Sequence, residues 1–176
     1  MAKQFFDVFP SLKLEKKIQD LFEQVMVEKV SATKRGDYIR ATVSCDYLIP
    51  KEMVFKVETE IKKQFFSGYN MQVKLYERFR LSGQYTPEKL MNVYKDSILL
   101  ELRQHSPVEY HLFKGADIDF SGGEEIGLTI EDTVLGKSKA AELCRIMEKI
   151  FNDRCGFSVH CQIHYKEIKV REREEE

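Results

Sequence analysis

The chain has 176 residues and a mass of 20.7 kDa, which is enough for one large domain or two small ones with a buried core. Its composition, 43% hydrophobic and 32% charged, excludes a disordered or fibrous protein. No apolar run approaches the roughly 20 residues that span a bilayer, and residues 1–30 lack a signal-peptide pattern. The four scattered cysteines do not suggest a disulfide framework. We therefore expect a cytoplasmic protein with no membrane contact.

Charge is distributed unevenly along the chain. Residues 1–80 contain 15 basic and 11 acidic side chains, whereas residues 81–176 contain 13 basic and 18 acidic ones. This change of sign indicates two structural units. Neither imbalance is large enough to demand nucleic acid as a partner.

The first half predicts the order helix, strand, strand, helix, strand. Ser11 is expected to cap the first helix, whose apolar residues recur at helical spacing up to Phe22. Lys34–Asp37 is expected to form a turn in which Gly36 adopts positive φ. The remaining elements are strands over Val25–Thr33 and Tyr38–Tyr47, a helix that starts at Pro50, and an alternating strand over Met71–Leu75.

The second half repeats this order after a linker over residues 82–86, where Thr86 can cap a helix that begins with Pro87. Its predicted elements are helices over 87–104 and after Ser106-Pro107, strands over Asp117–Phe120 and Glu125–Glu131, a helix over 138–153 and a strand over Phe157–Ile168. We therefore predict an α+β protein of two α-β-β-α-β modules, at residues 1–81 and 87–170, each with helices on one face of a three-stranded sheet. Residues 171–176 form a charged tail.

Two groups of side chains could bind metal, and both have a simpler interpretation. Zinc is suggested by Cys155, His160, Cys161 and His164, but strand alternation points Cys161 away from the two histidines. Asp117 and Asp119 share a strand face and could hold magnesium or act as an acid–base pair. A solvated, charged sheet edge explains them equally well. We predict no catalytic, cofactor or metal site.

The aromatic segment Phe5–Phe9 loosely resembles a short sliding-clamp-binding peptide. Asp7, however, stands where such a peptide would need an apolar residue. We expect this segment to pack onto the first helix instead.

The candidate interaction face consists of outward-pointing side chains on the second and third strands of the first module: Arg40, Lys74, Tyr76 and Arg78. These cations and one aromatic ring could bind phosphates and stack a base, or bind an acidic protein partner. A solvated face covered by long side chains is the alternative. The element order resembles a truncated KH domain, although the GXXG clamp of that fold is missing.

Diffuse patterns along nearly the whole chain resemble the extreme N-terminal region of the PolC-type DNA polymerase III alpha subunit. The segments that carry this resemblance are Tyr47–Pro50, Met71–Leu75, Tyr94–Ile98, Glu101-Leu102, Ser106-Pro107, the helix closing at Phe151, and Cys155–Phe157. The resemblance implies two small N-terminal domains ahead of an OB domain, a PHP domain, a 3′–5′ exonuclease and a polymerase core. Residues 171–176 resemble the opening of the linker to the OB domain, so we expect an excised N-terminal piece of a longer polymerase.

The resemblance implies a non-catalytic role for this segment, because no catalytic residue of the family maps to it. The first domain of the family is similar to the polymerase-contacting domain of the clamp-loader tau subunit. A replisome protein-interaction module is therefore expected, with tau as partner and a weak DNA contact as a further possibility. The alternatives are a KH-like protein that binds single-stranded nucleic acid and a small enzyme that uses the acidic strands.

Overall fold

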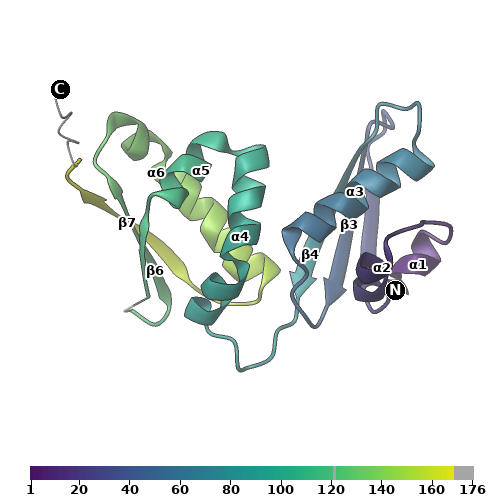
Figure 1. Cartoon of the computed structure of the whole chain (residues 1–176), viewed down its shortest axis with the longest axis horizontal. Helices are drawn as coiled ribbons and strands as arrows, with labels where there is room; N and C mark the ends of the chain where they lie inside the picture. The colour runs from purple at the N-terminus through teal and green to yellow at the C-terminus, as the bar shows by residue number, and fades with distance from the viewer. Residues whose placement is uncertain (121, 169–176) are drawn as a thin grey trace, which may run out of the picture.

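The computed structural model describes residues 1–120 and 122–168, which form two α+β units joined by residues 80–86 (Figure 1). The first unit has a sheet in the order β1-β2-β3-β4, and the second has a sheet in the order β5-β6-β7. Two modules of mixed α+β structure, as predicted, are confirmed. The exact domain boundaries at residues 81 and 87 remain predictions, and the predicted tail at 171–176 lies outside the described residues.

The first unit contains one strand and one helix more than predicted. Its elements are β1 (Lys3–Gln4), α1 (Phe5–Val8), α2 (Lys16–Phe22), β2 (Met26–Ala32), β3 (Tyr38–Cys45), α3 (Lys51–Phe65) and β4 (Gln72–Phe79). The sheet has four strands instead of three, because Lys3 and Gln4 pair antiparallel with β2. The remaining strands follow the predicted order: β2 is antiparallel to β3, and β3 is parallel to β4.

The predicted start of the first helix is wrong. Ser11 lies in a turn and α2 begins at Lys16, where Glu15 occupies the N-cap position. Leu12 is buried in the core, so the chain between Pro10 and Glu15 packs as an irregular segment before the helix can start. The turn at Gly36 is confirmed, with φ of 67°, a conformation that glycine adopts without strain.

The aromatic segment at the N-terminus packs as predicted. Phe5 is fully buried, and its ring centroid lies 4.9 Å from that of Phe22 on α2 and 5.0 Å from that of Phe9. Aromatic pairs at such distances add to the free energy gained by burial. The segment therefore belongs to the core of the first unit.

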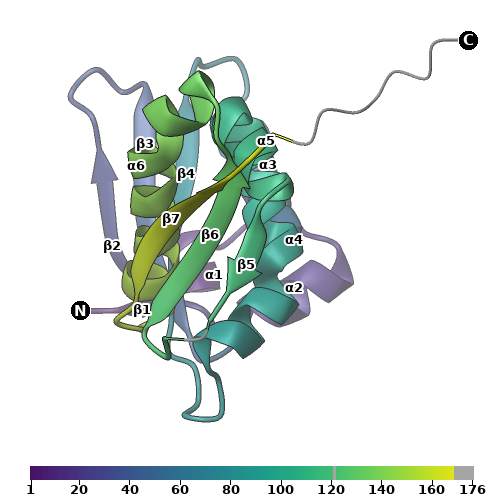
Figure 2. The ribbon, with the colours of Figure 1, turned by 90° about the vertical axis from the view of Figure 1, so that its left-hand side faces the viewer.

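The second unit repeats the strand pairing of the first. Its elements are α4 (Pro87–His105), α5 (Pro107–Lys114), β5 (Asp117–Asp119), β6 (Glu125–Glu131), α6 (Val134–Glu148), a π-helix η1 (Lys149–Arg154) and β7 (His160–Lys166). β5 is antiparallel to β6, and β6 is parallel to β7. β3 in the first unit and β6 in the second thus each have one antiparallel and one parallel neighbour, and in each unit a helix connects the parallel pair (Figure 2).

In the second unit, the start of α4 agrees with the prediction and the start of α6 does not. Thr86 accepts a hydrogen bond from the Lys89 backbone N–H, and Pro87 occupies the first turn of α4. The helix predicted over 138–153 begins four residues earlier, because Thr133 caps it by accepting from Gly136 N–H at 2.8 Å. A Thr side chain that accepts such a bond stabilises the first turn of a helix.

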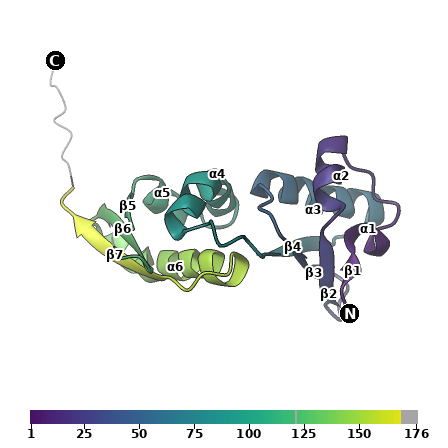
Figure 3. The same ribbon diagram turned by 90° about the horizontal axis from the view of Figure 1, so that it is seen from below.

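The helices of the second unit lie between its own sheet and the first unit (Figures 1 and 3). The buried apolar residues of the two units form one continuous cluster. Phe79 at the end of β4 contacts Tyr94 on α4, with ring centroids 6.3 Å apart. Among the described residues, no helix combines the length and apolar character needed to cross a membrane.

Candidate functional site

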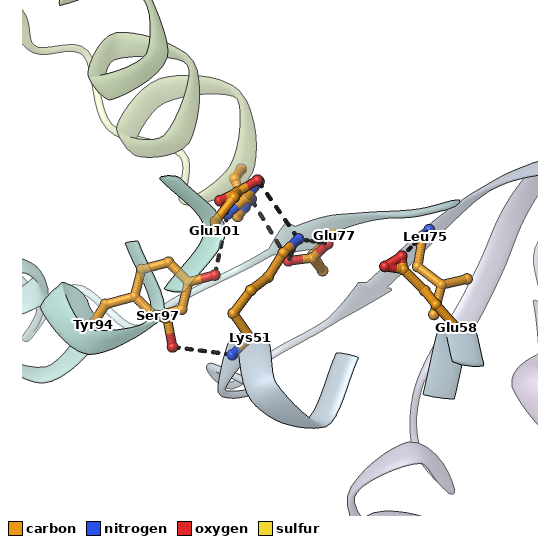
Figure 4. A network of polar contacts seen from close by, with 8 residues as sticks. Lys51, Glu58, Leu75, Glu77, Tyr94, Ser97 and Glu101 are labelled. Carbon is orange, nitrogen blue, oxygen red and sulfur yellow. Dashed lines mark hydrogen bonds and ion pairs between the residues drawn. The ribbon is translucent and has the colours of Figure 1, made fainter. Parts of the chain in front are cut away.

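A buried group of charged side chains connects the two units (Figure 4). Lys51, the first residue of α3, donates through Nζ to both carboxylate oxygens of Glu77 on β4, at 2.9 and 3.1 Å. Their side chains are 0% and 1% exposed. From the second unit, Arg154 donates to both carboxylate oxygens of Glu101, at 2.8 and 2.9 Å, and its Nε lies 3.7 Å from Glu77. Two cations and two anions thus meet at the junction, and we call these four residues the junction network.

Neutral polar groups complete the hydrogen bonding of the junction network. Ser97 Oγ on α4 accepts from the Lys51 backbone N–H at 3.0 Å, and the Tyr94 hydroxyl accepts from Arg154 at 3.2 Å. Within the described parts of the chain, every buried side-chain nitrogen and oxygen has a hydrogen-bond partner. Burying charge is costly unless each charge is paired and hydrogen-bonded, and this arrangement meets both conditions.

The junction network shifts the ionisation of its members. Burial alone would raise the pKa of the Glu101 carboxyl, but the hydrogen bonds and charge of Arg154, with the charge of Lys51, lower it to about 2. Burial raises the pKa of the Tyr94 hydroxyl well above its usual value. Glu101 is therefore ionised and Tyr94 neutral throughout the physiological range, which keeps the ion pairs intact.

Glu58 on α3 lies near the junction network and differs from it. Burial raises the pKa of its carboxyl to about 7, although the Lys51 charge and a 3.4 Å hydrogen bond from the Leu75 backbone N–H both lower it. Glu58 is thus a half-buried acid without a cation in hydrogen-bond contact in the described part of the chain. Its protonation is expected to change near neutral pH.

The residues of the predicted interaction face, Arg40, Lys74, Tyr76 and Arg78, lie on neighbouring strands of the first sheet, and we call them the cationic strip. The parallel register of β3 and β4 sets Arg40 beside Lys74 and places Thr42 beside Tyr76. The Arg40 guanidinium carbon lies 4.2 Å from the centre of the Tyr76 ring, and Lys74 Nζ lies 5.5 Å from it. Strand alternation brings Arg78 to the same face, and all four residues line one cavity. That this face binds a partner stays a prediction.

This strip forms one wall of a cleft of about 340 Å³ between the two units. The opposite wall comes from the end of α4 and from α6 and η1, and it includes Arg145, Lys149 and Asp153. The hydrogen bond with Tyr38 and the charges of Lys74, Arg40 and Lys149 together outweigh burial and lower the pKa of the Tyr76 hydroxyl. The cationic field at Tyr76 thus has contributions from both units, and we call this cavity the basic cleft.

The second-unit residues of the basic cleft are what sequence reasoning missed. Nothing in the sequence links Lys149 to Tyr76, which are 73 positions apart. The junction network was missed as well, although it left one signal. Glu77 stands between Leu75 and Phe79, at an alternation position where both neighbours are buried and apolar. A charged residue at such a position indicates a buried partner.

A larger groove of about 630 Å³ lies among α2, α3 and α4. Its charged lining is mixed in sign, and two of its members, Lys56 and Glu52, pair with each other at 3.4 Å. Its apolar lining includes Leu14, Phe55 and Leu100. This groove has no excess of one charge that would select a ligand.

The other candidate sites of the sequence are not assembled. In β7, His160 and His164 are exposed while Cys161 is half-buried on the opposite face, as predicted, and Cys144 donates through Sγ to the Cys161 carbonyl oxygen at 3.3 Å. Asp117 pairs with Lys166 at 2.9 Å. Over residues 1–120 and 122–168, no group of three or more His, Cys, Asp or Glu is placed to hold a metal ion.

Comparison with known proteins identifies the first unit. Residues 4–75 match the family described as DNA polymerase III polC-type N-terminus I. The first unit is therefore similar to a polC-type N-terminal domain, and the match covers less than half of the chain. The match begins in β1 and ends within β4, so Arg40 and Lys74 belong to the polC-type part of the basic cleft, whereas Tyr76, Arg78 and Lys149 lie beyond it. Searches of the curated proteins and of the solved structures found no match to the chain.

Proposed function

We propose that this chain is a non-catalytic N-terminal part of a PolC-type DNA polymerase III alpha subunit and acts as a protein-interaction module of the replisome. The observation that carries the proposal is the coincidence of a polC-type family match over residues 4–75 with a cationic strip on the same unit that lines an open cleft. In this proposal the parent protein is a cytoplasmic DNA-directed DNA polymerase with 3′–5′ exonuclease activity. Catalysis belongs to its other domains.

The proposed partner is the clamp-loader tau subunit, and the proposed contact surface is the strip formed by Arg40, Lys74, Tyr76 and Arg78. Charged surfaces of this kind speed association and select partners of opposite charge. The junction network supports this role, because its ion pairs Lys51–Glu101 and Arg154–Glu77 connect the second unit to the first beside the strip. A fixed orientation lowers the entropic cost of binding.

Binding of tau to the chain tests the proposal. Reversing the strip with Arg40→Glu, Lys74→Glu and Arg78→Glu is expected to abolish capture of tau in a pull-down at 0.1 M salt. The matched control reverses three exposed lysines on the helices of the same unit, Lys16, Lys17 and Lys63, and should retain binding. Equal capture by both variants would refute the proposed surface, and absence of capture by the unmodified chain would refute tau as the partner.

The KH-like alternative makes a different prediction in a gel shift with oligo-dT. Its affinity should fall steeply with salt, because each neutralised phosphate releases counterions. A protein-interaction module is expected to bind oligo-dT weakly or not at all. Tight, salt-sensitive binding to oligo-dT would favour the single-strand binder.

A further inference from the structure

The basic cleft contains cations whose charge the chain itself does not balance. Four of its cationic side chains make no hydrogen bond or ion pair with any residue in the described ranges: Arg40, Lys74, Arg78 and Lys149. The Arg40 and Lys74 side chains approach only the Tyr76 ring. Arg154, which also lines the cleft, is fully engaged by Glu101, Glu77 and Tyr94. Arg154 therefore belongs to the junction network, whereas the four unpaired cations are available to bind a ligand.

Anionic groups that could offset these cations are few. Glu77 and Glu101 line the cleft but are already bound by Lys51 and Arg154. Arg145 is paired with Glu142 at 2.6 Å, so it contributes little to the excess. Asp153 is the remaining carboxylate among the lining residues that the structure describes. The cleft therefore has a net positive charge, which favours a ligand that carries anionic groups.

The aromatic content of the cleft favours a peptide over a nucleic acid. Proteins that bind single strands combine a basic track with open aromatic faces on which bases stack. The described lining has two such rings, Tyr76 and His105. The Arg40 guanidinium lies over the Tyr76 ring at 4.2 Å, and the His105 ring packs edge-on against Phe55 at 5.8 Å, so neither ring presents an uncovered face in the way a stacking platform does. A guanidinium that lies over a ring can still donate two parallel hydrogen bonds to a carboxylate.

We propose that the basic cleft binds an acidic peptide segment of a partner protein, with carboxylates held by Arg40, Lys74 and Arg78 on one wall and by Lys149 on the other. This inference rests on the proposed function and extends it, because the binding site then requires both units. The volume of about 340 Å³ suits a few acidic side chains, and the junction network fixes the separation of the two walls.

The test uses the whole chain and fluorescence anisotropy with two labelled probes, a twelve-residue peptide of alternating Glu and Ser and an oligo-dT of twelve nucleotides. Arg40→Glu and Lys149→Glu are each expected to weaken peptide binding about tenfold at low salt, since each converts an attraction into a repulsion. Lys149→Gln removes the attraction without adding a repulsion, so it should weaken peptide binding about threefold. Far-UV circular dichroism confirms that each variant is folded.

The matched control is Lys137→Glu on the same helical segment. Lys137 lies twelve residues before Lys149, or about 18 Å along a helix axis, which exceeds the roughly 8–10 Å over which exposed charges interact at physiological salt. The affinity of the Lys137→Glu variant for the peptide should remain within about twofold of that of the unmodified chain.

Each outcome of the test has a distinct meaning. Loss of peptide binding in both Arg40→Glu and Lys149→Glu, but not in Lys137→Glu, supports the composite site. A loss in Arg40→Glu alone overturns the role of the second unit but leaves the proposed first-unit surface intact. Tighter binding of oligo-dT than of the peptide, or no peptide binding by the unmodified chain, overturns the acidic occupant. Capture of tau in the pull-down remains a separate measurement of the proposed function.

Discussion

The junction network predicts a measurable coupling between the two units. We consider Lys51→Met and Glu77→Gln, singly and together. Lys51→Met removes two hydrogen bonds, at 2.9 and 3.1 Å, from a Glu77 carboxylate that is 1% exposed. Glu77→Gln leaves the Lys51 ammonium buried, with the nearest remaining carboxylate, Glu101, at 3.7 Å.

The magnitude follows from the burial and from the partner that each variant leaves behind. Removing one member of a buried ion pair generally costs about 3–5 kcal/mol of unfolding free energy. Here the cost should lie near 3 kcal/mol, because Arg154 Nε still lies 3.7 Å from Glu77 and Glu101 still lies 3.7 Å from Lys51. The double variant leaves no uncompensated charge at this position, so its cost should fall short of the sum by about 2 kcal/mol.

Urea unfolding followed by far-UV circular dichroism measures these free energies, and tyrosine fluorescence provides a second probe because the chain has no tryptophan. The matched control is Lys56→Met, which removes an exposed ion pair with Glu52 on the same helix and should cost less than about 0.5 kcal/mol. Costs below about 1 kcal/mol for both single variants, or strict additivity in the double variant, would refute the reasoning. If the unmodified chain unfolds in one step and a variant unfolds in two, the network also makes the two units unfold together.

Three further predictions concern stability. Glu58→Gln should stabilise the protein by about 2–3 kcal/mol at pH 8 and by little at pH 4. The reason is that the folded-state pKa of Glu58, near 7, exceeds the unfolded value, so the stability of the unmodified protein falls as pH rises between about 4.5 and 7. Urea midpoints across this range measure the difference between variant and unmodified protein, and a difference that does not change with pH would contradict the prediction. Thr86→Ala should cost about 1 kcal/mol in thermal unfolding by removing the hydrogen bond to Lys89 N–H at the start of α4, and Thr86→Ser should restore most of it. Phe5→Ala should cost about 3–5 kcal/mol because the ring is fully buried against Phe9 and Phe22, whereas a cost near zero, as for an exposed peptide motif, would show that the segment is not part of the core.

Local features of the chain could be predicted because their causes are local. Gly36 in a turn, Thr86 before Pro87, and the alternation along β3 and β4 each depend on neighbouring residues only. The start of α2 was mispredicted because Leu12 is buried in the core and the Lys13 backbone is hydrogen-bonded to the Gln64 side chain, 51 positions away. The same reason explains the short strand β1, whose partner lies more than 20 residues away.

Periodicity along the chain was enough to predict two α+β units. Strand alternation was enough to place Arg40, Lys74, Tyr76 and Arg78 on one face as the first wall of the candidate site. Only the tertiary structure decided that the second unit packs against that face and adds Lys149 to it. It also decided that Lys51, Glu77, Glu101 and Arg154 meet in one buried network. Periodicity describes each element relative to its own axis, whereas the packing of two units depends on complementary surfaces that form only after each unit has folded.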